Sequence, residues 1–158
     1  MELKIPHGHE LADLTPLLPI FLAYALSFRS IRAYWNNHHH LFKGVKEVNP
    51  KIMWANLHFL FWPSLIPFAT GWFGENYNQS WPTALYGILL LLTAFAYQIL
   101  QRNITTDKQS LPLKGKISLL AYLLSVILAF INPIFSVILF ILVAGMWFIP
   151  EKNKVKEM

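Results

Sequence analysis

Long apolar runs constrain this chain more than any other feature of its sequence. Four blocks contain few charged residues, and they cover about 16–37, 52–73, 82–101 and 117–149. A transmembrane helix needs about 20 mostly apolar residues, within a tolerated range of about 17 to 25. Because 55% of all residues are hydrophobic and only 13% are charged, the composition is typical of a membrane protein and not of a soluble domain. We therefore expect an all-α fold, an integral membrane helical bundle.

The last apolar block is too long for one span. As a single helix it would be about 50 Å long, whereas the hydrocarbon core of a bilayer is about 30 Å thick. Asn132-Pro133 stands in the middle of the block, and proline disfavours helix at the residue before it. We predict a hairpin there, and hence five transmembrane helices in one transmembrane domain that covers residues 1–158. The predicted spans are about 16–37, 52–73, 82–101, 115–131 and 134–150.

The basic residues are unevenly distributed between the loops. Most of them follow the first, third and fifth spans: Lys43, Lys46, Lys51, Arg102, Lys108, Lys114, Lys116, Lys152, Lys154 and Lys156. The segments between spans two and three and between spans four and five contain no Lys or Arg. By the positive-inside rule, the basic loops and the C-terminus are cytoplasmic and the N-terminus lies outside.

Several function classes lack the residues they need. There is no cysteine, and no P-loop, GxGxxG turn or nucleophile with a neighbouring base occurs. We therefore expect no enzyme activity and no cofactor. The basic residues lie in short loops and not on one binding face, so we expect the lipid bilayer, and no nucleic acid, as a partner.

Two arginines are the most costly residues within a predicted span. An arginine at the bilayer centre costs about 2.5 to 3.5 kcal/mol on insertion scales. At 100° per residue, Arg29, Arg32 and Asn36 share one helix face. Either both arginines extend to the inner interface, or they form a polar stripe that faces a protein interior or an aqueous path. No carboxylate lies within a predicted span, so a carboxylate partner would come from another chain or another segment.

The histidines at the end of the first span form a weak metal-binding pattern. Consecutive helical residues point 100° apart, so His38, His39 and His40 cannot converge on one ion, and we expect no metal site. In the second span, His58 lies at i+4 from Trp54 and at i−4 from Trp62. We expect a packing role for His58 with a hydrogen bond to a neighbouring helix, and proton relay remains the alternative.

Several stretches together resemble one known family. LAYALSF, YWNNHHHLF, WANLHFLFWPSLIPFATGWFGEN, ALYGILLLL and WFIP before a basic tail are similar to the transmembrane protein 175 family of endosomal and lysosomal potassium channels and their small prokaryotic relatives. The resemblance covers nearly the whole chain. It implies six-helix units that assemble around a central pore, as homotetramers in the small relatives, with a pore lined by the first helix. Arg29 and Arg32 depart from the family, which usually has apolar or small residues there.

The opening residues ELKIP resemble the segment that follows the first helix of the family. The resemblance therefore implies that the first, pore-lining helix is missing from this chain. It also implies a hydrogen-bond network that grips that helix during assembly. Carried over by motif, its residues are Trp35, Asn37, His38, His39, Trp54, Asn56 and His58.

The resemblance implies a subunit of a potassium-permeable channel that transports K+ passively, with K+ as the permeant ion. Without the first helix, we expect little or no conduction. The alternatives are a non-conducting structural or assembly protein and a proton-coupled transporter that uses His58 and the histidine cluster. The expected location is a prokaryotic plasma membrane.

Overall fold

The computed structural model describes residues 10–105 and 113–147, and this part of the chain is helical without a strand. A short 3-10 helix, η1 (Leu11–Leu17), leads into α1 (Leu18–Phe42). The other helices are α2 (Pro50–Glu75), α3 (Ser80–Ile104), α4 (Leu113–Ala129) and α5 (Pro133–Met146). The predicted all-α fold is confirmed. The apolar block 117–149 is broken at residues 130–132, directly before Pro133.

Two of the helices begin with the same local sequence, an asparagine followed by proline. The Asn49 side chain accepts a hydrogen bond from Ile52 N at 2.9 Å, and the Asn132 side chain accepts one from Ile134 N at 3.0 Å. In both cases the proline occupies the first turn, where its missing N–H is not needed. Asn-Pro thus caps the helix that follows it, and because Asn132 comes directly after the turn that ends α4, it explains the hairpin between α4 and α5.

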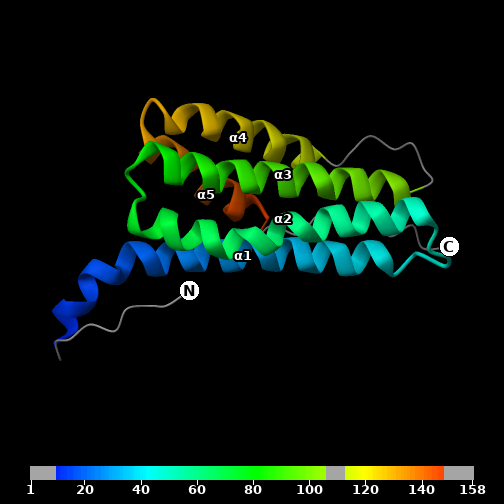
Figure 1. Ribbon diagram of the computed structural model, residues 1–158, viewed down its shortest axis with the longest axis horizontal. Helices are drawn as coiled ribbons and strands as arrows, with labels where there is room; N and C mark the ends of the chain where they lie inside the picture. Colours follow the sequence, from blue (N-terminus) through cyan, green and yellow to red (C-terminus); the bar gives the residue numbers. More distant parts are fainter. Residues whose placement is uncertain (1–9, 106–112, 148–158) are drawn as a thin grey trace.

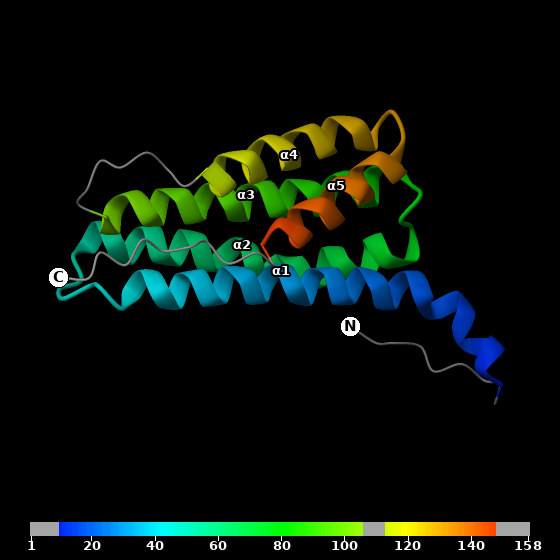
Figure 2. The same cartoon turned by 180° about the vertical axis from the view of Figure 1, so that it is seen from behind.

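The first four helices lie side by side in chain order, and α5 packs across them. Figure 1 shows α1, α2, α3 and α4 as neighbouring rods, and contacts occur between each consecutive pair. Figure 2, seen from behind, shows α5 in the space between α4 and α1, and α5 contacts α1, α3 and α4. The fifth helix therefore closes one face of the bundle.

The helices fall into two length classes. α1, α2 and α3 have 25, 26 and 25 residues, which is about 37 to 39 Å of helix. α4 and α5 have 17 and 14 residues, about 26 and 21 Å. Within the described residues, Leu14–Phe42, Pro50–Glu75 and Ser80–Ile104 are long and apolar enough to cross a membrane. That α4 and α5 also cross it stays a prediction.

The core of the bundle combines an aromatic cluster with a buried group of hydroxyls. Phe140 of α5 packs against Phe73 and Tyr86, with ring centroids 6.1 and 5.2 Å away. Ser27 Oγ lies 2.6 Å from Thr70 Oγ1 and 2.9 Å from Tyr86 Oη. These three hydroxyls, hereafter the hydroxyl node, join α1, α2 and α3, and all three residues are buried. Among the described residues, no buried side-chain nitrogen or oxygen lacks a hydrogen-bond partner.

Candidate functional site

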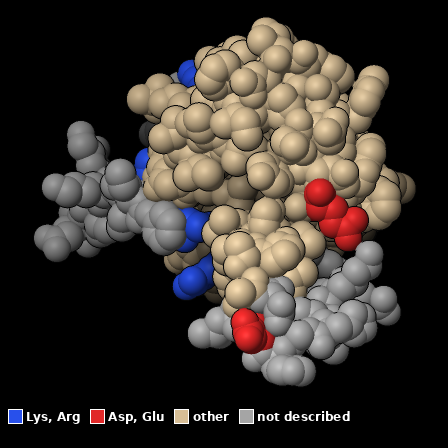
Figure 3. Space-filling model, turned by 90° about the vertical axis from the view of Figure 1, so that its left-hand side faces the viewer, with Lys and Arg blue, Asp and Glu red and all other residues tan. Residues whose placement is uncertain are grey.

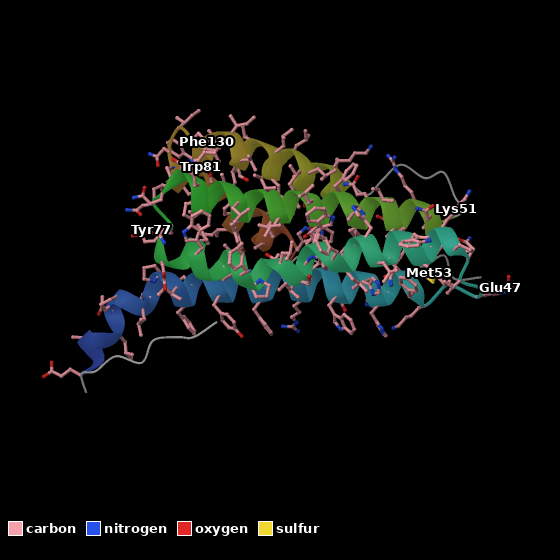
Figure 4. The ribbon with its side chains drawn as sticks, viewed as in Figure 1. Glu47, Lys51, Met53, Tyr77, Trp81 and Phe130 are labelled. Carbon is pink, nitrogen blue, oxygen red and sulfur yellow. The ribbon has the colours of Figure 1, made fainter. Side chains whose placement is uncertain are left out.

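The predicted site residues lie toward the end of the bundle that carries the α1–α2 loop. Figure 4 labels Glu47, Lys51 and Met53 at this end and Tyr77, Trp81 and Phe130 at the opposite end. We call the first the basic end, because its described loops and helix termini carry Lys43, Lys46, Lys51 and Arg102. Figure 3 looks onto the opposite end, where acidic groups are visible and the blue groups lie only at the margin.

His38 holds the basic ends of α1 and α2 together. Its Nε2 donates to Asn56 Oδ1 at 2.7 Å. The imidazole also stacks on Phe59, with ring centroids 5.5 Å apart, and on Trp35 at 6.3 Å. The contact with Phe42 is closer still, at 4.6 Å. These three aromatic rings, hereafter the aromatic cage, surround the hydrogen-bonded imidazole of His38 and fix its plane.

The predicted network does not form one cluster within this chain. His38, Asn56 and Trp35 come together, whereas Trp35 and Trp54 are 66% and 68% exposed. His39 is exposed as well. Asn37 is half-buried and lines a hollow between α1 and the α4–α5 hairpin. Successive helical residues point 100° apart, so Asn37 lies toward the α4–α5 hairpin whereas His38 contacts α2. Whether these residues grip a further helix stays a prediction.

Among the described residues, the hydrogen bond of His58 is to its own helix, and a partner on a neighbouring helix stays a prediction. Trp62 Nε1 donates to His58 Nε2 at 3.2 Å, and both residues belong to α2. The rings meet edge to face, with centroids 6.0 Å apart. Their i, i+4 spacing brings them into contact, so the indole satisfies the imidazole locally. His58 itself is exposed on the bundle surface.

Arg29 has a partner that the sequence reasoning overlooked. Its Nε donates to the carbonyl oxygen of Ala144 at 3.2 Å. Ala144 lies in the last turn of α5, where carbonyls have no N–H partner within the helix. A search for carboxylates alone missed this backbone acceptor. Arg32 and Asn36, the other members of the predicted stripe, are exposed.

Two further bonds involve the hairpin. Trp147 Nε1 at the end of α5 donates to Ser118 Oγ of α4 at 3.1 Å, which closes the hairpin on itself. Gln98 Nε2 of α3 donates to the Gly115 carbonyl of α4 at 3.1 Å, which ties the hairpin to α3. The sequence analysis did not single out these residues or the hydroxyl node. Small polar residues spaced through apolar helices were the available signal, because such residues usually bond across helices in membranes.

The described residues contain no group of three or more His, Cys, Asp or Glu side chains placed to hold a metal ion. The neighbouring rings of His39 and His40 lie 6.2 Å apart at a steep angle. The chemistry of this region is therefore hydrogen bonding, aromatic packing and positive charge.

Comparison with known proteins gives two kinds of match. Residues 1–67 match the family described as the endosomal/lysosomal potassium channel TMEM175. A protein named as a potassium channel from Chryseobacterium sp. (strain P1-3) is 44% identical over 100% of this chain and 87% of its own length. Another potassium channel, from Streptomyces collinus (strain DSM 40733 / Tue 365), is 27% identical over 66% of this chain and 55% of its own length. No solved structure matches the chain. With this identity over its whole length and with apolar helices of spanning length, the chain is an integral membrane protein that belongs to the TMEM175 family of potassium channels.

Proposed function

We propose that this protein is a subunit of a potassium-permeable channel that moves K+ passively across a prokaryotic plasma membrane, as a homotetramer and without a cofactor. The observation that carries the proposal is the 44% identity with a bacterial potassium channel across the entire chain. Insertion in the lipid bilayer follows from the apolar helices. No covalent chemistry is required, because K+ moves down its gradient.

The packing of the bundle favours an ion path between subunits and not through one subunit. Tyr86, Phe140 and Ile66 fill the interior and are no more than 1% exposed. The hydroxyls of the core bond to one another or to helix carbonyls. An ion path needs an aqueous lining or a narrow constriction, and neither is compatible with such a filled core. A pore therefore requires a surface that several copies share.

The exposed surface of α1 and α2 is suited to such an interface. Large aromatic side chains are exposed along both helices: Phe21, Phe28, Trp35, Trp54, Phe61 and Phe68. The polar residues Arg32, Asn36, His58 and Ser64 are exposed among them. Polar and charged side chains inside a membrane usually face other protein or water and not lipid. Aromatic anchors with polar neighbours are typical of protein interfaces.

Ion flux from liposomes tests the proposal. The protein is isolated from its native membrane, its intact mass is recorded, and it is reconstituted into liposomes loaded with potassium. For a protein that includes the pore-lining first helix implied by the family resemblance, we expect passive K+ efflux that empty liposomes do not show, and for the 158 residues alone we expect little or none. Absence of flux from the protein with that helix would favour a non-conducting assembly protein, and uphill transport driven by a pH gradient would favour a proton-coupled transporter. Either result contradicts the proposed function.

Subunit number is tested separately, by cross-linking in the native membrane. We expect a ladder that ends at four subunits. The variant His38→Ala should weaken the tetramer, since it removes the bond to Asn56 that orders the surface of α1 and α2. His40→Ala is the matched control, because His40 is exposed and lies outside the predicted network. A ladder that ends at two subunits, or equal effects of both variants, would contradict this assembly.

A further inference from the structure

The turn between α4 and α5 is apolar and uncharged. Its residues are Phe130, Ile131 and Asn132, and the side chains of Phe130 and Ile131 are exposed, that of Ile131 to 73%. The connection between α2 and α3 lies at the same end of the bundle and is more polar, with the sequence NYNQ at 76–79 (Figure 4). Exposed apolar side chains that lie together usually mark a contact with another protein or with a membrane. The turn between α4 and α5 therefore needs a neighbour other than water.

The backbone N–H groups of the turn are satisfied within the chain. Residues 130–132 donate their N–H groups to carbonyls in the last turn of α4, at 2.8 to 3.2 Å. Ile134 donates to the Asn132 side chain at 3.0 Å and Phe135 to the Asn132 carbonyl at 3.1 Å, while Pro133 has no N–H group. Backbone donors without a partner are unfavourable where water is scarce. A turn with all of these donors satisfied can therefore enter the lipid surface.

A contact with Trp81 sets the level of the turn relative to the membrane. The Trp81 indole meets the Phe130 ring edge to face, with centroids 5.1 Å apart. Trp81 is exposed and lies in the first turn of α3, one of the helices that are long and apolar enough to cross a membrane. Tryptophan at the end of a spanning helix usually lies at the level of the lipid headgroups. The turn therefore lies at this level as well.

The surface of the hairpin favours lipid over a second copy of the chain as the neighbour of the turn. Between residues 117 and 147, all of which are described, the exposed side chains are apolar except that of Asn132. They include Leu120, Leu124, Ile127, Ile138 and Ile141. The three serines of this stretch are buried. Protein-facing surfaces in a membrane usually carry small or polar residues, and exposed polar residues occur on α1 and α2 instead.

We infer that the α4–α5 turn inserts into the lipid surface at this end of the bundle, with Phe130 and Ile131 among the glycerol groups and upper acyl chains of the phospholipids. Burial of these two apolar side chains in lipid is favourable, because it removes them from water. Trp81 anchors the turn by packing against Phe130 at headgroup level. The hairpin thereby reaches the same membrane surface as α3. This contact is additional to the proposed channel function and does not depend on it.

Labelling of single cysteines tests the inference, because the sequence contains no cysteine. Ile131→Cys places a thiol in the turn, and Asn78→Cys is the matched control in the exposed α2–α3 connection at the same end. Both full-length variants are placed in lipid nanodiscs, which leave both membrane faces open to a charged maleimide. Thiols react as thiolates, which apolar surroundings disfavour, so we expect Ile131→Cys to react at least about tenfold more slowly than Asn78→Cys. In SDS the two thiols should react alike.

Quenching by brominated phospholipids identifies the neighbour of the turn. The thiol of Ile131→Cys is labelled in detergent with an uncharged fluorophore, and the protein is then transferred to nanodiscs. We expect phospholipids with bromine on the acyl chain near the glycerol group to quench this fluorophore more than phospholipids with bromine near the terminal methyl group. The same fluorophore on Asn78→Cys should lose little fluorescence with either lipid.

A second substitution tests the anchor. In the Ile131→Cys background, Trp81→Ala should speed maleimide labelling by about two- to tenfold, the range expected for the loss of an aromatic pair. Trp81→Phe keeps a ring against Phe130 and should leave the rate nearly unchanged. Trp72→Ala is the matched control, since Trp72 is an exposed tryptophan in the last turn of α2 at the same end. It should not change the rate either.

Three results would overturn the inference. Equal labelling of Ile131→Cys and Asn78→Cys would show that the turn lies in water. Slow labelling without quenching by either brominated lipid would show that protein, such as a second copy of the chain, covers the turn. Equal effects of Trp81→Ala and Trp72→Ala would show that Trp81 does not anchor it. None of these measurements uses an ion gradient, so a failure of the proposed channel function would leave their outcomes unchanged.

Discussion

The long helices α1–α3 and the short hairpin α4–α5 differ in length and in the polarity of their residues. The long helices each carry an apolar stretch of spanning length and a polar segment at the basic end. The described part of the hairpin has many exposed apolar side chains. In the described residues, α4 and α5 have 17 and 14 residues, against 25 or 26 in each long helix. All the predicted site residues belong to α1 and α2.

The two regions are also held together in different ways. The long helices are joined by hydroxyls and by close backbone approach: a Cβ added at Gly74 would lie 2.9 Å from Ile20 Cα. The hairpin docks largely by packing of buried side chains, and Phe140 is the one that meets aromatic rings of both α2 and α3, Phe73 and Tyr86. Disrupting each contact in turn tests whether this division is correct.

The largest effect is expected at Phe140. The substitution Phe140→Ala removes a ring that is 1% exposed and opens a cavity between the hairpin and α3, so we expect a loss of about 3 to 5 kcal/mol of folding free energy. Phe135→Ala is the matched control on the same helix, since Phe135 is 50% exposed and should cost much less. Unfolding in mixed detergent measures both. Equal losses would show that Phe140 does not anchor the hairpin.

Gly74 comes next, within the long helices. Gly74→Ala forces α1 and α2 apart, since the new Cβ would meet backbone at 2.9 Å, and we expect a loss of about 1 to 3 kcal/mol. Gly71→Ala has nothing within 4 Å and should stabilise α2 by about 0.5 to 1 kcal/mol through helix propensity. Thermal unfolding distinguishes the two signs. A stabilising Gly74→Ala would mean that α1 and α2 are not in tight contact there.

The hydroxyl node should contribute less than either packing contact. Ser27→Ala removes its bonds to Thr70 and Tyr86 and leaves a buried tyrosine hydroxyl without this partner, which we expect to cost about 1 to 2 kcal/mol. Ser64 bonds only locally, to the Phe61 carbonyl at 2.6 Å, and is exposed. Ser64→Ala should therefore be nearly neutral in the same unfolding assay. If both serines behave alike, the node does not hold the three helices together.

More of the fold than of the site could be predicted from the sequence, and the reason is physical. Helix positions follow from apolar length and from Asn-Pro turns, both of which are local in sequence, and the break before Pro133 lies where Asn132-Pro133 predicts it. Partners across helices depend on helix rotation and on where each helix stops. The carbonyl that binds Arg29 is available only because α5 ends at Met146, and no residue pattern marks that acceptor. The bond between His58 and Trp62, by contrast, could have been predicted from the i, i+4 spacing of the two residues alone.

The smallest expected effect is also the most informative about the predicted site, and it concerns the bond between His38 of α1 and Asn56 of α2 at the basic end. A double-mutant cycle with His38→Ala and Asn56→Ala should give a coupling energy of about 0.6 kcal/mol, with an upper range of about 1.7, as for hydrogen bonds between membrane helices. The matched cycle replaces His38→Ala with His39→Ala, and its coupling should be near zero because His39 is exposed. The aromatic cage contributes to the single variant His38→Ala but cancels in the cycle with Asn56, so the coupling isolates the polar bond. If the cycle of His39 with Asn56 gives the larger coupling, His38 is not the residue that joins α1 to α2. The polar segment would then be held by contacts beyond a single chain.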